Sequence, residues 1–219
     1  MIPHALLRSG FSVLPVLLLT AALGLTDTRR LDDGLLDPDW FGVAEGWRTR
    51  SGIDYFWMKP GFTLESRTIE LASWPDPLFL NGKRDAQDGR TAYRLTDSMP
   101  GRLERALSPA LAGRAQVSRR KGDVRLIGRF VDLNAGAPSW AEPNYANATW
   151  DLKLVDAATG ETLAAFHHRG VSGLDTLNLS EKVNRWLTRR LAPALREGYE
   201  VWASAEPVEG AVASSTLPR

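Results

Sequence analysis

Side chains that commonly carry out chemistry are few in this sequence. After residue 25 the only histidines are His167 and His168. They are adjacent in a segment with strand-like alternation, and adjacent strand residues point to opposite faces of a sheet, so we do not expect them to bind one metal ion or to act as a pair. The chain has no cysteine, which excludes disulfides, thiolate metal sites and cysteine nucleophiles.

Carboxylates that could work as a general acid and base are plentiful but dispersed. Asp151, Glu161 and Asp175 lie in or near a predicted β-hairpin, where carboxylates are also typical of a solvated strand face and its turn. The sequence has no Gly-x-Ser-x-Gly motif, no phosphate-binding Gly-rich loop and no His-Glu-x-x-His motif. We therefore predict no catalytic residue, no metal ligand and no cofactor, and keep a carboxylate-based hydrolase built on these three residues as an alternative.

Cationic and aromatic side chains are the better candidates for contact with a partner or ligand. Arg119 and Arg120 open the densest cationic run, which predicts either a phosphate, lipid-headgroup or glycan contact or a solvated turn that blunts an edge strand. Large aromatic residues gather in the 40–57 segment and again in the 134–146 segment. They either close one end of the core or form a platform for a partner. The candidate contact residues are Trp40, Trp47, Trp57, Trp140, Tyr145, Arg119 and Arg120.

The first 25 residues differ in kind from the rest. Arg8 precedes an apolar run that ends in small residues, with Ala22 and Gly24 at the −3 and −1 positions of a cleavage site. We predict an export signal or, if it is not cleaved, an N-terminal anchor. The protein is then periplasmic or anchored in the inner membrane by its signal segment, and it is not a lipoprotein because it has no cysteine to lipidate.

Charge gives no reason to expect a nucleic-acid partner. Arg8 is the only charged side chain in residues 1–24, so the rest of the chain has as many acidic as basic residues. A balanced charge provides no general attraction to nucleic acid or to an anionic membrane surface. Nothing in the pattern points strongly to a homo-oligomer either.

The clearest structural pattern is a β-hairpin in the 147–170 segment. Two alternating runs flank a turn in which Gly160 can take a positive φ. If Asp156 pairs with Glu161, Trp150 lies opposite His167. This alignment predicts that His167 points into the core against the Trp150 indole and that His168 points away from it.

Other elements follow from periodicity and capping residues. Strands are predicted at 62–71, 115–118 and 124–133. One helix is expected to begin at Ser98 and end at Gly113, or to begin near Thr91 and kink at Pro100. A second amphipathic helix is expected to begin after Asn178 and to bend at Pro193.

These elements predict an α+β fold. We expect a two-layer sandwich, with one mixed or antiparallel sheet of about five strands and two amphipathic helices on one of its faces. The predicted division of the chain is a signal peptide or N-terminal anchor at 1–25, an aromatic-rich linker or arm at 26–60, an α/β domain at 61–202 and a disordered tail at 203–219.

The order of these elements resembles that of bacterial envelope domains of unknown function, many of them lipoproteins. The resemblance rests on the export signal, the strand VRLIGRFVDL, the hairpin segment VDAATGETLA and a last helix that contains Trp186, and it covers roughly residues 60–200. It implies a small α/β sandwich like those of accessory lipoproteins of transport machines and of the amino-terminal domain of the Tol–Pal translocation protein. The lipidation cysteine of those proteins is missing, and the resemblance supplies no catalytic residue.

Together these patterns predict a non-enzymatic accessory or binding protein of the bacterial cell envelope, within a transport, secretion or envelope-maintenance assembly. Its partner would be an envelope protein or a lipid or glycan component, held by the sheet edge, the 134–146 loop or the aromatic arm. One alternative is the hydrolase of envelope material described above. Another is a carrier of a lipid or hydrophobic ligand, in which the Trp40–Trp57 arm closes a cavity between sheet and helices.

Overall fold

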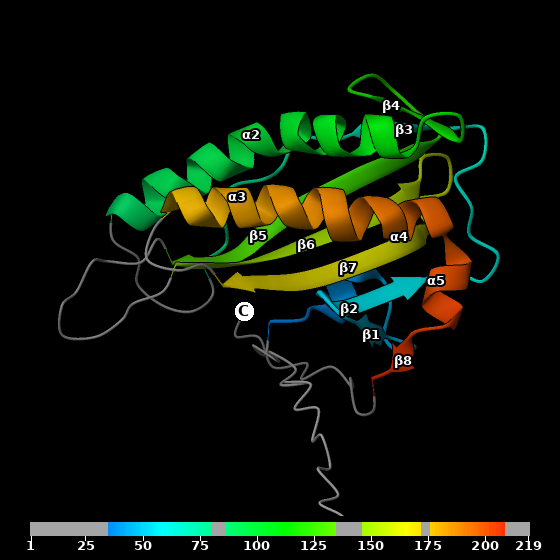
Figure 1. Ribbon diagram of the computed structural model, residues 1–219, viewed down its shortest axis with the longest axis horizontal. Coiled ribbons are helices and arrows are strands. Elements are labelled where there is room, and N and C mark those ends of the chain that lie inside the picture. The colour runs from blue at the N-terminus through cyan, green and yellow to red at the C-terminus, as the bar shows by residue number, and fades with distance from the viewer. Residues whose placement is uncertain (1–34, 80–85, 135–145, 172–175, 209–219) are drawn as a thin grey trace, which may run out of the picture.

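The computed structural model describes residues 35–79, 86–134, 146–171 and 176–208, and these form one mixed β-sheet with helices packed on it (Figure 1). The strands are β1 (Arg48–Arg50), β2 (Ile53–Met58), β3 (Arg67–Leu71), β4 (Ala115–Ser118), β5 (Val124–Asn134), β6 (Asn147–Asp156), β7 (Thr162–Val171) and β8 (Glu206–Pro207). The helices are α1 (Pro38–Phe41), α2 (Ala86–Ala110), α3 (Thr176–Trp186), the π-helical turn η1 (Leu187–Leu191), α4 (Ala192–Glu197) and α5 (Tyr199–Ala203).

The strand order of the sheet is β4-β3-β5-β6-β7-β2-β1-β8. β3 is parallel to both β4 and β5, and the other neighbouring strands are antiparallel. The predicted α+β class with a mixed sheet is confirmed. The predicted strand number is wrong, because the described residues form eight strands.

Three strands were not predicted. β1 and β2 lie in the segment expected to be a linker or arm, and β8 lies in the segment expected to be a tail. β2 pairs with β7 from Tyr55 opposite His167 to Met58 opposite Ala164. Its residues are buried or half-buried on both faces, so the sequence of β2 lacks the simple alternation that marks a strand with one solvated face.

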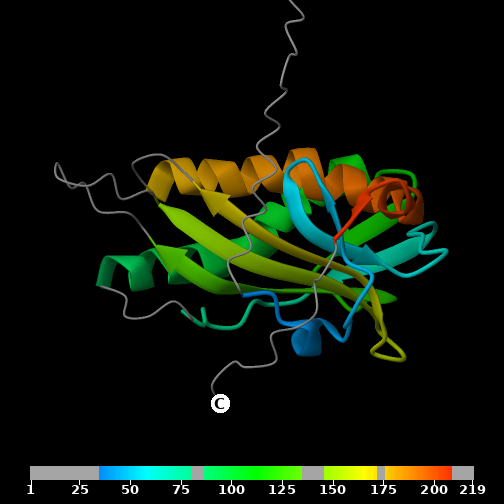
Figure 2. The same ribbon diagram turned by 90° about the horizontal axis from the view of Figure 1, so that it is seen from below.

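Different parts of the chain cover the two faces of the sheet. α2, α3 and α4 lie on one face (Figure 1), where Leu152 and Leu154 of β6 are fully buried. Residues 35–47, which include α1, lie against the opposite face (Figure 2), where Trp47 and Tyr55 are buried in a second cluster. No helix in the described part of the chain is long and apolar enough to cross a membrane.

The helix boundaries differ from the predicted ones at both amino ends. α2 begins at Ala86 and runs through Pro100, so Ser98 is not a cap, and its Oγ donates to the carbonyl of Leu95. A proline inside a helix costs about 3 kcal/mol, but Leu95 and Met99 are buried on the same face as the rest of the helix, and each such side chain contributes about 1.5–3 kcal/mol. α3 begins at Thr176, two residues before the predicted cap.

Pro193 is accommodated by a π-helical turn. Proline has no N–H to donate to the carbonyl four residues before it, and η1 ends two residues before Pro193. The N–H of Ala192 reaches back five residues, to the carbonyl of Leu187. The helix therefore continues past the proline, and Arg189 and Arg190 remain on its exposed side. π-helical turns of this kind are frequent at functional sites.

The hairpin of β6 and β7 is confirmed, but its predicted register is wrong by one residue beyond Leu163. Val155 pairs with Thr162 as predicted, then a bulge places Leu154 opposite Ala164. A one-residue shift moves every later β7 side chain to the other face. His168 therefore lies opposite Trp150 on the helix-covered face, and His167 lies opposite Asp151 on the other face.

Candidate functional site

The predicted aromatic contacts that the structure describes pack against their own domain. Trp47 is buried, donates its Nε1–H to the Val43 carbonyl, and lies edge-on to Phe41 with ring centroids 5.0 Å apart. Trp40 and Trp57 are half-buried in the same cluster. Because this cluster is on the sheet face opposite the helices, the arm does not close a cavity between sheet and helices as the carrier hypothesis required.

Other predicted contacts lie at the turn after β4 or outside the described residues. Arg119 donates its Nε–H to Glu104 at 3.0 Å. The backbone N–H of Arg120 donates to the Ser118 hydroxyl, and both arginines are exposed. Trp140 and Tyr145 lie outside the described residues. A role of these residues in partner contact stays a prediction.

The carboxylates of the hydrolase hypothesis are not brought together. Asp151 is fully buried in β6, whereas Glu161 is exposed at the hairpin turn and pairs with Lys59 at 2.6 Å. The carbonyl of Glu161 accepts from the N–H of Asp156, so Glu161 lies beside Asp156. Asp156 is five residues along β6 from Asp151. At about 3.3 Å per residue, the backbones of Asp151 and Glu161 are therefore roughly 16 Å apart. Carboxylate pairs of glycosidases are at most about 9.5 Å apart. Asp175 lies outside the described residues.

A buried charge cluster lies between the 35–47 segment, called the arm from here on, and the sheet. Arg129 of β5 donates from Nε to Asp151 at 2.8 Å and from Nη2 to Asp37 at 2.9 Å. The other oxygen of Asp151 accepts from Nδ1 of His167 at 2.7 Å. Lys153 donates to the Trp40 carbonyl. These contacts satisfy charges that would otherwise be costly to bury, so the cluster fastens the arm to the sheet.

Two pKa values record this environment. Partial burial would raise the pKa of Asp37, but hydrogen bonds from the Arg129 guanidinium and the Trp40 N–H outweigh burial and lower it. Burial is the main cause that lowers the pKa of Lys153, and the nearby charge of Arg129 acts in the same direction. Arg129 therefore contributes to both shifts, as a hydrogen-bond donor to Asp37 and as a like charge near Lys153.

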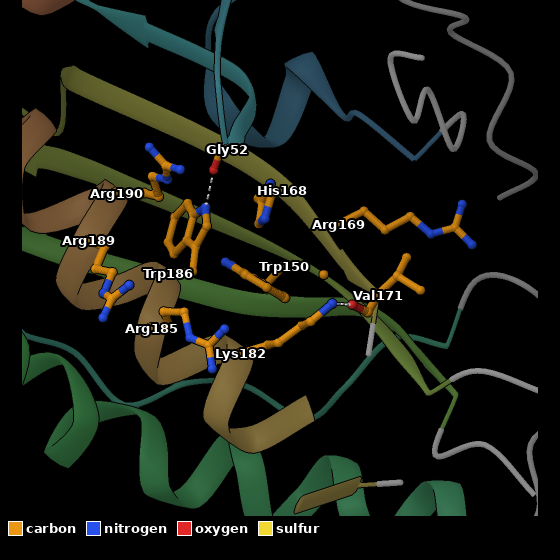
Figure 3. A pocket seen from close by; sticks show the side chains of 11 residues that line it. Gly52, Trp150, His168, Arg169, Val171, Lys182, Arg185, Trp186, Arg189 and Arg190 are labelled. Atoms are coloured by element: carbon orange, nitrogen blue, oxygen red, sulfur yellow. Dashed lines mark hydrogen bonds between the residues drawn. The ribbon is translucent and has the colours of Figure 1, made fainter. Parts of the chain in front are cut away.

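A basic pocket of about 400 Å³ opens on the helix-covered face, between the end of β7, the α3–η1 helix and the turn that joins β1 to β2 (Figure 3). Its volume lies within the roughly 300–1,000 Å³ range of small-molecule sites. Its rim carries the cationic side chains of Lys182, Arg185, Arg189 and Arg190, whereas the Arg169 side chain extends away from them (Figure 3).

The floor of the basic pocket is aromatic. His168 and Trp186 are stacked, with ring centroids 5.1 Å and planes 12° apart, and the Trp150 indole lies edge-on to both. The Nε1–H of Trp186 donates to the Gly52 carbonyl at 2.8 Å, which ties α3 to the β1–β2 turn. Gly170 leaves room for the Trp150 ring, since a Cβ there would come within 2.7 Å of it.

Most of the rim cations have no counterion among the described residues. Arg185, Arg189 and Arg190 are exposed and form no ion pair there, and Lys182 donates to the Val171 carbonyl (Figure 3). Arg190 lies over the β1–β2 turn, because a Cβ on Gly52 would come within 2.5 Å of its Nε. The described lining contains no carboxylate, so the pocket carries a strong positive charge.

One carboxylate lies behind the floor. Asp54 of β2 is 2.8 Å from Nδ1 of His168 and accepts the backbone N–H of Arg169. Asp54 itself does not line the pocket. No group of three or more potential metal-ligating side chains occurs within the described ranges.

The pocket residues were not among the predicted contacts. Lys182, Arg185 and Arg189 recur at helical spacing, but in the sequence they are indistinguishable from the solvated face of an amphipathic helix. The available signal was their position around Trp186. That position indicates a pocket only when the hairpin register is known, because the register brings His168 and Trp150 under the same helix.

No family model and no curated protein matches the sequence. The chain is similar to a solved structure of PelC from Paraburkholderia phytofirmans, with 11% identity, 63% of this chain and 92% of that chain covered, and a TM-score of 0.42. It is similar to a DUF330 protein from Xanthomonas campestris, with 15% identity, 67% and 90% covered, and a TM-score of 0.40. It is also similar to a lipoprotein from Neisseria meningitidis, with 12% identity, 57% and 98% covered, and a TM-score of 0.35.

These similar structures are bacterial and include a lipoprotein. They agree at a coarse level with the predicted resemblance to bacterial envelope domains, but the resemblance to the Tol–Pal protein is not shown. The expectation that nothing points to a homo-oligomer is wrong, because the similar PelC structures are dodecamers.

Proposed function

We propose that this chain is a non-enzymatic accessory protein of the bacterial cell envelope that works by binding an anionic envelope component in the basic pocket. The observation that carries the proposal is a rim of four cationic side chains around an aromatic floor, with no carboxylate in the described lining. Concave sites lined by one sign of charge concentrate ligands of the opposite sign.

The physical chemistry of the rim favours anions strongly. Guanidinium groups present planar forks of N–H donors that match phosphate and carboxylate oxygens. The buried rings of Trp150 and Trp186 exclude water from the floor, and an ion contact is stronger where the surroundings have a low dielectric constant. An anion at the rim would also relieve the repulsion between Arg185, Arg189 and Arg190.

The composition of the lining supports binding rather than catalysis. Among the described residues it includes one histidine and no serine, threonine, cysteine or carboxylate. The histidine is stacked on Trp186, and its Nδ1 lies 2.8 Å from Asp54. A pair of nucleophile and general base, which acyl or glycosyl transfer requires, is not among these groups.

The cellular location in this proposal rests on the N-terminal segment. Residues 1–25 carry the pattern of an export signal, which directs the protein to the periplasm or anchors it in the inner membrane. We further propose that the protein contributes to a transport, secretion or envelope-maintenance assembly.

Calorimetric titration with inorganic phosphate and sulfate tests the proposal. We expect saturable binding that weakens at least tenfold in Arg185→Gln/Arg189→Gln. The control is Arg90→Gln/Arg94→Gln, which removes two exposed arginines of α2 that do not line the pocket. Equal affinity of the two double variants, or no binding by the wild type, would contradict the proposal.

A further inference from the structure

We infer that the anion taken by the basic pocket is a phosphate monoester carried by a sugar. This inference rests on the proposed function and names its ligand class. The phosphorylated sugar could be part of a soluble glycan or of a glycolipid headgroup, since both present the same chemical group.

The charge of the pocket argues for more than one negative charge on the ligand. Arg185, Arg189 and Arg190 have no ion-pair partner in the described part of the chain. A carboxylate would neutralise one of them, whereas a phosphate monoester carries about 1.5 to 2 negative charges at neutral pH and three acceptor oxygens. Three guanidiniums and three oxygens allow several charge-assisted hydrogen bonds at once.

The spacing of the arginines also fits a compact tetrahedral group. Arg185 and Arg189 are four residues apart, so their Cα atoms are separated by about 6 Å along the helix axis. Arg190 extends from η1 over Gly52 of the β1–β2 turn. Figure 3 shows these three side chains around Trp186, while Arg169 extends away from them. All three side chains are long and exposed, so they are free to turn toward one multiply charged group.

The size of the pocket argues for a ligand larger than a bare ion. At about 30 Å³ per water molecule, a phosphate ion would fill a minor part of a pocket of this size. The whole pocket has a volume of about 400 Å³. The part that a phosphate would leave free is bounded by Trp150, Val171 and the backbone of Gly170. A sugar would bring C–H groups to the half-buried Val171 side chain and hydroxyl groups to the exposed cations of the rim.

The test compares four soluble probes by calorimetry with the wild-type protein: glucose 6-phosphate, glucuronate, inorganic phosphate and glucose. We expect glucose 6-phosphate to bind on the order of tenfold more tightly than glucuronate and inorganic phosphate, and glucose not to bind. Arg185→Gln/Arg189→Gln should lose at least tenfold in affinity for glucose 6-phosphate, and Arg90→Gln/Arg94→Gln should not.

The outcomes separate this inference from the proposed function. If glucuronate binds as tightly as glucose 6-phosphate, phosphate selection is overturned while anion binding stands. If inorganic phosphate binds as tightly, the sugar contributes nothing and the inference is overturned. If none of the anions binds, both proposals fall.

A further experiment identifies the source of the phosphorylated sugar. The protein is sedimented with phosphatidylcholine vesicles that contain or lack a phosphorylated glycolipid. Co-sedimentation with the glycolipid vesicles alone supports a lipid-borne ligand. Co-sedimentation with phosphatidylcholine as well would overturn headgroup recognition.

Discussion

His168 and Trp186 are stacked, although one lies on β7 and the other on α3. Their ring planes are 12° apart, and Trp150 lies edge-on to both rings. The stack joins the helix layer to the sheet and forms the floor of the basic pocket. The same contacts therefore contribute to stability and to the site.

Trp186→Phe should destabilise the protein by about 1–2 kcal/mol, because it removes the hydrogen bond to the Gly52 carbonyl and part of a buried ring. Urea denaturation measures the change. Trp57→Phe is the control, since Trp57 is half-buried and has no hydrogen-bond partner for its indole among the described residues. Equal losses in the two variants would show that the Gly52 contact contributes nothing.

Arg129→Met should destabilise the protein by about 3–5 kcal/mol, because it leaves the fully buried Asp151 without its cation. Arg125 lies four residues earlier on β5, and its ion pair with Glu70 is much more exposed, with side chains 47% and 20% accessible. Arg125→Met should therefore cost at most about 1 kcal/mol. Chemical denaturation of both variants checks the contrast, and similar losses would contradict the assigned role of the cluster.

Stability should fall in acid partly through Asp37. Its pKa is lowered in the folded protein from the ordinary value of 3.8, so the contribution is fully present above that pH and is lost as the pH falls through the folded pKa. Asp37→Asn should make the free energy of unfolding less dependent on pH below 3.8. Asp39→Asn, at an exposed neighbouring position, should keep the wild-type slope. Identical slopes for Asp37→Asn and wild type would refute the linkage.

Two glycine substitutions should have opposite effects. Gly160 takes φ +75 at the hairpin turn, so Gly160→Ala should destabilise by about 1 kcal/mol even though its Cβ would meet no atom within 4 Å. Gly89 lies in α2, where a Cβ is equally unobstructed, and Gly89→Ala should stabilise by about 0.5–1 kcal/mol. Thermal unfolding measures both, and a shared sign would be inconsistent with the backbone argument.

Anion affinity should fall as salt is raised, because the rim arginines are exposed and the screening length is about 10 Å at 0.1 M ionic strength. The plot of binding constant against salt should be less steep for Arg185→Gln/Arg189→Gln than for Arg90→Gln/Arg94→Gln. Phosphate titrations at low and high sodium chloride provide the slopes. Parallel slopes would place the bound anion elsewhere.

Much of the fold could be predicted from local patterns. Gly160 between two alternating runs specified the hairpin, and its strand β6 has Leu152 and Leu154 buried on one face under the helices. These features depend on residues close together in the chain. Burial of an alternating face and a positive φ at a turn are local requirements, so the sequence alone reveals them.

The strands from 48–58 could not be predicted in the same way. β2 is buried or half-buried on both faces because β7 pairs with it and the arm and helices pack over it. A strand with two covered faces has no simple alternation. Its position depends on contacts between residues more than a hundred positions apart.

The sequence by itself determined the hairpin, the amphipathic helices and the class of the fold. Only the tertiary structure decided which histidine belongs to which face. One extra residue at Leu163 shifts the register, placing His168 against Trp150 and Trp186 and pairing His167 with Asp151. The bulge is stabilised by a bond outside the hairpin, from the N–H of Lys59 to the Leu163 carbonyl, and no pattern within the hairpin itself encodes that contact.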